Sequence, residues 1–208
     1  MSKERLYIFD TTLRDGAQTQ GVDFSVDDKL KVALALDSLG VDYIEGGWPG
    51  ANPTDTDFFH KKHTFINAKL TSFGMTKKTG RSAENDPGLS ALLNSNTPAV
   101  CLVGKSWDFH VDVALGISNE ENLENISESA KLFVKEKKEF MFDAEHFFDG
   151  YKANSEYALL CLKAAFDQGA RWIVLCDTNG GTLPHEITKI VEEVSKTIPG
   201  ENLGIHAH

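Results

Sequence analysis

The 208-residue sequence has few cysteines and no apolar stretch long enough to cross a membrane. A membrane-spanning helix needs about 20 consecutive apolar residues, and the apolar run near the N-terminus is also too short for a signal peptide. The three cysteines, Cys101, Cys161 and Cys176, are scattered and form no CxxC pair. We interpret them as reduced core residues rather than as disulfides or thiolate ligands. We therefore expect a cytoplasmic protein without a membrane partner.

Basic residues are also in the minority. The sequence has 21 lysines and arginines against 31 aspartates and glutamates, which gives a net charge of −10. Because contacts to phosphates need clustered lysine and arginine, we expect no nucleic-acid partner. Low-complexity segments and linkers are lacking, and a hydrophobic content of 41% is enough for one good core. We therefore expect a single domain over residues 1–208.

Strand-like and helix-like segments alternate along the whole chain. The predicted strands are nearly continuous apolar runs, which is typical of a parallel sheet that is covered on both faces. The unit of roughly 30 residues favours a (β/α)8 TIM barrel, an α/β fold. A doubly wound sheet is the alternative, but no GxGxxG follows the first strand, and polar residues follow nearly every strand. The predicted strands are 6–9, 41–45, 69–73, 99–103, 139–143, 171–176 and 203–208, and the predicted helices are 25–39, 54–62, 82–94, 120–137, 155–168 and 184–196.

Seven strands and six helices do not close a (β/α)8 barrel. We therefore expect an incomplete catalytic barrel, truncated after the seventh strand, that lacks the last β/α unit and any C-terminal regulatory domain. The first and seventh strands would then be exposed edges, which favour pairing with another chain.

Polar residues at the predicted strand ends would meet on one face, because the active groups of a TIM barrel lie at the carboxyl ends of its strands. Two histidines that are two residues apart on a strand point to the same side. Together with a carboxylate they could hold a divalent cation and leave positions open for a substrate. The alternative is a pair of polar residues at a strand exit. The strand-end residues are Arg14, Asp15, Glu45, Lys105, Glu145, Thr178, His206 and His208.

Two motifs resemble those of the DRE-TIM metallolyase family, which includes isopropylmalate, homocitrate and citramalate synthases and HMG-CoA lyase. They are Asp10-Thr-Thr-Leu-Arg-Asp-Gly-Ala-Gln18 and His206-Ala-His208. The first is highly specific, whereas the HxH motif alone is not. The segments 142–151 and 104–108 most resemble the citramalate synthase branch. The resemblance extends over essentially the whole chain.

This resemblance implies a metal-dependent acyltransferase. Asp15, His206 and His208 would be ligands of a divalent ion, which could be Mg, Mn, Co or Zn, and the ion would hold a 2-oxo acid. Arg14 would stabilise the negative charge that grows on the keto oxygen. Acetyl-CoA would be the co-substrate of a Claisen condensation with pyruvate that gives citramalate for isoleucine and branched-chain amino-acid biosynthesis.

The resemblance also implies roles for further strand-end residues. Glu145 would lie near the reacting carbons and could act as a base, although an ion-paired loop carboxylate is the alternative. The Thr178 hydroxyl would contact the substrate carboxylate, unless it only stabilises its own turn. Gln18 is a weaker substrate-binding candidate. Asp10 would orient the metal ligands, and Glu45 would orient Arg14 or be a simple strand-end charge. The remaining histidines are interpreted as surface or structural residues: His60, His63, His110, His146 and His185.

The substrate and the direction of the reaction have alternatives. Homocitrate synthases carry an arginine four residues before the strand-five glutamate, whereas this chain has Met141. An apolar residue cannot neutralise a second carboxylate, so pyruvate is favoured, and 2-oxoisovalerate, the isopropylmalate synthase substrate, also fits. A lyase of the HMG-CoA lyase type would use the same metal site. The non-enzymatic alternative is an inactive metal-binding barrel fragment. We expect a homodimer, and we expect residues 1–208 alone to be nearly inactive.

Overall fold

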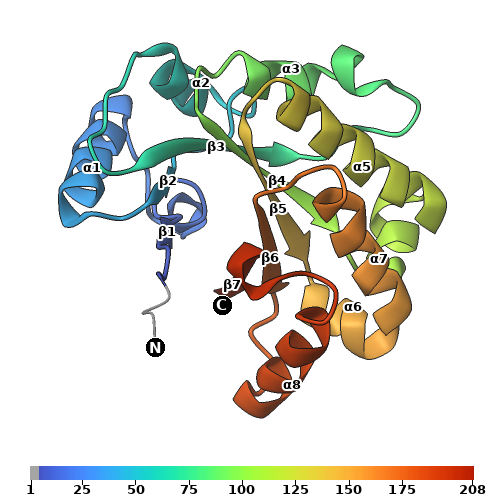
Figure 1. Cartoon of the computed structure of the whole chain (residues 1–208). Helices are drawn as coiled ribbons and strands as arrows, with labels where there is room; N and C mark the ends of the chain where they lie inside the picture. Colours follow the sequence, from blue (N-terminus) through green and yellow to red (C-terminus); the bar gives the residue numbers. More distant parts are fainter. Residues whose placement is uncertain (1–4) are drawn as a thin grey trace. The chain divides into compact units, whose positions relative to one another are not determined.

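The computed structural model describes residues 5–208, which divide into two units (Figure 1). Unit 1 comprises residues 5–74 and 90–100, and unit 2 comprises residues 75–89 and 101–208. No helix within residues 5–208 combines the length and the apolar character that a membrane span requires.

Unit 1 contains the first three strands, which are parallel and follow one another in chain order. Phe9 of the first strand pairs with Tyr43 of the second, which pairs in turn with Lys69 of the third. Two helices connect these strands, as predicted. The elements are β1 (Phe9–Asp10), η1 (Gly16–Gln18), α1 (Val26–Leu39), β2 (Tyr43–Glu45), α2 (Pro53–His60) and β3 (Lys69–Met75).

Helix α1 begins and ends at the residues that the sequence predicts. Ser25 accepts a hydrogen bond from the Asp28 backbone N–H at 3.1 Å, and the Asp28 carboxylate accepts one from the Ser25 N–H at 3.2 Å. These two bonds form a capping box, which satisfies two backbone donors of the first turn. Gly40 then ends the helix with a φ of 89°, a left-handed conformation that glycine adopts without steric cost.

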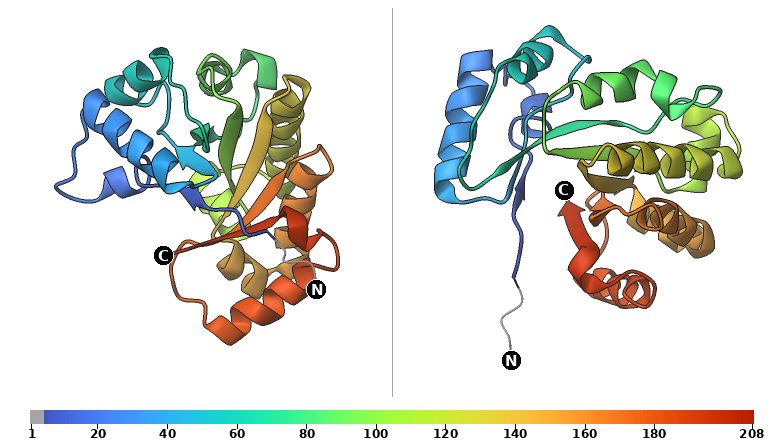
Figure 2. Two further views of the ribbon diagram at one scale, coloured as in Figure 1. Left: turned by 60° about the vertical axis from the view of Figure 1, so that its left-hand side comes forward. Right: turned by 45° about the horizontal axis from the view of Figure 1, so that its top comes forward.

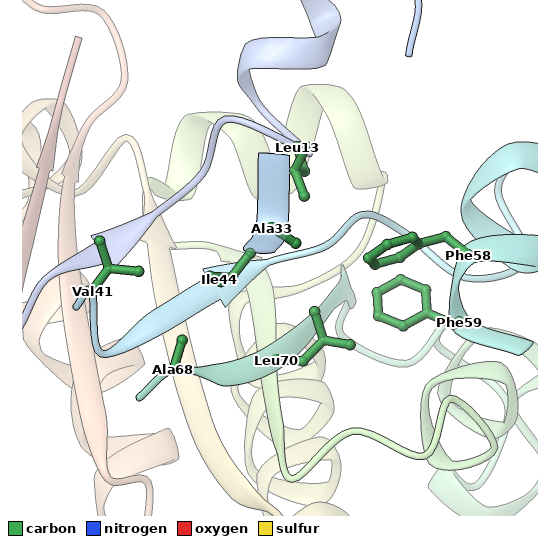
Figure 3. Packing of buried hydrophobic residues seen from close by; sticks show 8 residues of the cluster. All are labelled: Leu13, Ala33, Val41, Ile44, Phe58, Phe59, Ala68 and Leu70. Atoms are coloured by element: carbon green, nitrogen blue, oxygen red, sulfur yellow. The ribbon is translucent and has the colours of Figure 1, made fainter. Parts of the chain in front are cut away.

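The core of unit 1 lies between its strands and helices. Figure 3 shows Phe58 and Phe59 of α2 beside Leu70 of β3. A Cβ on Gly46, just after β2, would come within 2.8 Å of the Phe58 ring and 3.0 Å of Leu70. Only glycine therefore allows α2 to pack this closely against the end of β2.

Unit 2 contains the later strands, also parallel and in chain order. The pairs Phe142–Ile173 and Cys176–His206 fix the register of its last three strands. Figures 1 and 2 show α5, α7 and α8 along the outer side of these strands. The elements are η2 (Ala83–Asn85), α3 (Pro87–Leu93, shared with unit 1), β4 (Ala99–Lys105), α4 (Asp108–His110), η3 (Val111–Leu115), α5 (Asn119–Lys135), β5 (Glu139–Glu145), α6 (Phe147–Ala153), α7 (Ser155–Phe166), β6 (Trp172–Asp177), α8 (Pro184–Val194), η4 (Gly200–Asn202) and β7 (Leu203–Ala207).

Several predicted elements differ from the observed ones. The predicted helix 82–94 breaks at Asp86, whose carboxylate accepts hydrogen bonds from Gly88 N at 2.8 Å and Leu89 N at 3.1 Å. These bonds start a new helix at Pro87. Three elements were not predicted, namely the short helix α4, the π-helical turn η3 and helix α6. Each lies in a short segment directly after a strand, which was interpreted as a loop.

The first predicted strand is much shorter than its apolar run. Leu6 and Ile8 are 81% and 49% exposed, and only Phe9–Asp10 pairs as a strand. The Ile8 N–H bonds to the Asp42 carboxylate at 2.9 Å, a side-chain acceptor that takes the place of a ladder partner. In the seventh strand, Ile205 is 54% exposed. Both strands thus carry the exposed apolar side chains expected of edges. All three cysteines are buried thiols, as predicted.

Candidate functional site

The turn after β1 is built around one carbonyl group. The Thr11 oxygen accepts hydrogen bonds from the backbone N–H groups of Arg14 at 3.1 Å, Asp15 at 2.9 Å and Gly16 at 3.1 Å. The Asp10 carboxylate adds bonds from the Thr12 N–H at 2.9 Å and from its hydroxyl at 3.2 Å. The backbone that carries Arg14 and Asp15 is therefore fixed by the strand end itself.

Arg14 is held by its neighbours in unit 1. Its Nε donates to Glu45 at 2.7 Å, and its guanidinium lies 4.0 Å above the ring centre of Phe73. A second nitrogen lies 3.4 Å from the Asp15 carboxylate. Glu45 is fully buried and contacts Arg14 directly. This contact is the one that a role in orienting Arg14 needs. Gln18 lies in η1 and is exposed.

Glu145 forms an ion pair with Lys105 in unit 2. Its backbone oxygen accepts hydrogen bonds from the Ser106 N–H at 3.3 Å and the Ser106 hydroxyl at 2.7 Å, which join the ends of β4 and β5. The Glu145 carboxylate therefore contacts an ammonium group, as in the ion-paired alternative of the sequence analysis.

Thr178 connects the end of β6 to the end of β5. Its hydroxyl oxygen accepts the His146 backbone N–H at 2.9 Å. His146 adopts a left-handed backbone with a φ of 55°, which is uncommon for a residue other than glycine. The hydroxyl proton of Thr178 can still be donated to a substrate carboxylate, so this bond and the predicted contact are compatible.

Two histidines that were interpreted as surface or structural residues lie beside the Lys105–Glu145 pair. The ring centres of His110 and His146 are 4.5 Å apart, edge to face, and His110 lies 4.6 Å from Trp107. Burial, followed by the charges of His146 and Lys105, lowers the pKa of His110. The position of His146 directly after Glu145 is the signal in the sequence that could have placed it here.

His206 and His208 lie at the end of β7 with their rings 4.8 Å apart, so the two imidazoles are together as the alternation predicts. A Cβ on Gly180, in the loop after β6, would come within 2.4 Å of the His208 oxygen. That loop therefore packs tightly against the end of β7. Paired imidazoles with a carboxylate are donors that divalent Mn, Co and Zn accept, so the chemistry of these residues fits such an ion.

A family model described as HMGL-like matches residues 5–208. The chain belongs to the HMGL-like family. Members of this family typically depend on a divalent metal ion.

Curated relatives match the whole chain. It is 54% identical over 207 residues to the (R)-citramalate synthase of Aquifex aeolicus and 50% identical over 210 residues to that of Geobacter sulfurreducens. These matches cover 99% and 100% of this chain, and the chain spans 39% of the length of either relative. A 2-isopropylmalate synthase of Caldanaerobacter subterraneus is 29% identical, with 100% of this chain and 52% of the relative covered.

Solved structures of HMG-CoA lyases share the fold. The enzyme of Bacillus subtilis matches with a TM-score of 0.82 at 18% identity, covering 99% of this chain and 69% of that one. The lyase of Acinetobacter baumannii, solved with coenzyme A and 3-methylmalate, matches with a TM-score of 0.79 at 20% identity. This match covers 98% of the present chain and 66% of the lyase. The predicted fold class is therefore confirmed: residues 5–208 carry seven strands of a TIM-barrel-type α/β fold.

Proposed function

We propose that this chain is the catalytic barrel region of an acyl-CoA-dependent synthase that condenses acetyl-CoA with pyruvate to give citramalate. The observation that carries the proposal is the contrast in identity. The (R)-citramalate synthases are 45% to 54% identical over nearly the full chain, whereas the isopropylmalate synthases are 29% to 31% identical.

Asp15, His206 and His208 are the proposed ligands of a divalent ion, with Asp10 stabilising the turn that carries Asp15. When bound, such an ion polarises the carbonyl of a 2-oxo acid as a Lewis acid. Arg14, whose Nε is held by Glu45, would stabilise the negative charge that develops on the keto oxygen through its guanidinium.

Glu145 is the proposed base. It would take a proton from the methyl group of acetyl-CoA, and the resulting carbanion would attack the keto carbon of pyruvate. Lys105 would hold the carboxylate in place through their ion pair. The Thr178 hydroxyl would donate to the pyruvate carboxylate, with Gln18 as a further candidate contact. Hydrolysis of the thioester would then release citramalate and free coenzyme A.

Met141 supports a small, monocarboxylic 2-oxo acid. It is 1% exposed within β5, and its apolar side chain cannot neutralise a second carboxylate. The alternative substrate 2-oxoisovalerate is larger than pyruvate by an isopropyl group in place of a methyl group. Such differences are worth only about 1–3 kcal/mol in an apolar pocket, so relative turnover must decide between the two substrates.

The other parts of the proposal are a homodimer and a cytoplasmic enzyme of branched-chain amino-acid biosynthesis.

The test is release of free thiol from acetyl-CoA with a divalent ion and either pyruvate or 2-oxoisovalerate. We expect turnover with pyruvate by the full-length protein encoded by the gene, and little or none by residues 1–208 alone. Preferred turnover of 2-oxoisovalerate would identify an isopropylmalate synthase instead. Cleavage of a 3-hydroxy-3-methylglutaryl thioester without any condensation would favour the lyase alternative.

A further inference from the structure

Three polar side chains meet in unit 2: the proposed ligand His206 and two residues that have no role in the site described so far. Asp143, Cys176 and His206 come from the successive strands β5, β6 and β7, and each offers an atom within 4.8 Å of the others. Asp143 and Cys176 are each only 6% exposed.

Asp143 is unexpected at this position from packing alone. Its neighbours along β5, namely Phe140, Met141, Phe142 and Ala144, are all buried and apolar. Removing a carboxylate from water is costly unless strong donors surround it. An apolar residue would serve the core better, so the carboxylate points to a function for this side chain.

His206 supplies the donor that this function requires. If one of its ring nitrogens ligates a metal, the other carries a proton and needs an acceptor, most often a carboxylate. Cys176 is a poor acceptor, and its Sγ lies 3.8 Å from the Val174 carbonyl oxygen, to which the thiol can donate. The Asp143 carboxylate is the stronger acceptor of the two.

We propose that Asp143 is a positioning residue for His206: it accepts the proton of the non-ligating ring nitrogen and so fixes the tautomer and orientation of this ligand. This inference rests on the proposed function, because it assumes that His206 ligates the metal. It adds a residue that the resemblance to DRE-TIM metallolyases does not assign.

The test measures Mn²⁺ binding without turnover, by the loss of the free-ion electron paramagnetic resonance signal. In Asp143→Asn, which keeps the shape but loses the charge, we expect affinity about 10- to 100-fold below that of the parent protein. Asp112→Asn, an exposed aspartate of η3, is the matched control and should bind normally. His206→Ala should bind least.

The outcomes separate the two proposals. If His206→Ala binds Mn²⁺ as well as the parent, the metal assignment of the proposed function fails, and this inference fails with it. If His206→Ala loses binding but Asp143→Asn does not, only this inference fails. A thiolate absorption band in the Co²⁺ protein that Cys176→Ser removes would mean that the cluster itself ligates metal, which would overturn the positioning role.

A second measurement does not depend on the stability of the variant. Nitrogen-15 spectra of the parent protein loaded with diamagnetic Zn²⁺ report which ring nitrogen of His206 is protonated. We expect a single tautomer with a protected N–H. A ring N–H that exchanges freely with water would contradict the proposal.

Discussion

Arg14 donates its Nε–H to a buried oxygen of Glu45 at 2.7 Å, and the two residues lie at the ends of neighbouring strands. Glu45 is fully buried, whereas the Arg14 side chain is 12% exposed. The ion pair therefore holds the guanidinium through its Nε, while a terminal nitrogen lies 3.4 Å from the Asp15 carboxylate. The ring of Phe73 supports the same guanidinium from below at 4.0 Å.

Replacing Glu45 by alanine should strongly destabilise unit 1. Breaking a buried ion pair from one side leaves an uncompensated charge and typically costs about 3–5 kcal/mol. Glu45→Gln keeps an acceptor for Arg14 Nε and should lose less than half of that stability. Urea unfolding measures both changes, with Glu84→Gln, an exposed acid, as the control. Equal losses for the alanine and glutamine variants would show that a neutral acceptor does not hold Arg14 and would contradict the expected partial retention of stability.

The sequence is sufficient for the order of the elements because each apolar run and each helix cap is local. The Ser25–Asp28 box and Gly40 bound α1 as predicted. Local sequence is insufficient where a residue distant in the chain determines the length of an element or the contact of a side chain. The Asp42 carboxylate that bonds Ile8 shortens β1. The contact of His110 with His146 depends on how two loops pack, which no spacing within either loop encodes.

Glu145→Gln should reduce the rate of condensation by about 10²- to 10⁴-fold, the usual contribution of a positioned general base. Its effect on stability should be small, because the Lys105–Glu145 pair is partly exposed and such pairs contribute roughly 0–1 kcal/mol. Steady-state rates and thermal unfolding of the same preparation check the two statements. A rate loss that only follows a large drop in melting temperature would contradict the assignment of Glu145 as the base.

Thr178→Val should weaken substrate binding more than Thr178→Ser does. Valine removes both the acceptor of the His146 N–H and the proposed donor to the substrate carboxylate. A hydrogen bond to a charged group is worth about 1.5–3 kcal/mol, so KM for pyruvate should rise by about 10- to 100-fold. Serine keeps the hydroxyl and should stay close to the parent value. If both variants raise KM equally, the hydroxyl does not contact the substrate.

His110 should make the protein less stable in acid. Burial, then the charges of His146 and Lys105, lower its pKa in the folded protein below the ordinary 6.5. As the pH falls below about 6.5 the unfolded chain takes up this proton before the folded protein does, so stability is lost until the folded pKa is passed. His110→Gln cannot titrate and should lose less stability than the parent between pH 7.5 and 5.5, the range in which an ordinary histidine changes its charge.

The control for His110 is His185→Gln, because His185 is exposed on α8. This variant should keep the acid sensitivity of the parent protein. Melting temperatures across the same pH series measure all three proteins. Identical pH dependence in the parent and in His110→Gln would mean that His110 does not contribute to the acid sensitivity.

Lys29 is a buried cation of α1 that the pattern of residues did not single out, because lysines in helices are mostly exposed. It is 3% exposed, forms an ion pair with Asp55, and donates to the backbone oxygens of Leu13 and Gly46 at 2.9 Å each. One ammonium thus ties the turn that carries Arg14 to the end of β2. Its removal should therefore disturb both the stability of unit 1 and the placement of Arg14.

Lys29→Met should cost about 3–5 kcal/mol, because Asp55 and two carbonyl groups lose their common donor inside the protein. Lys31→Met, on the exposed face of the same helix, should cost less than about 0.5 kcal/mol. The double variant Lys29→Met, Asp55→Leu no longer contains the unpaired Asp55 carboxylate, so it should regain part of the stability that Lys29→Met loses. A double-mutant cycle of urea unfolding measures this difference. Strictly additive losses would show that Lys29 and Asp55 act independently, and the loss in Lys29→Met would then belong to the two carbonyl groups.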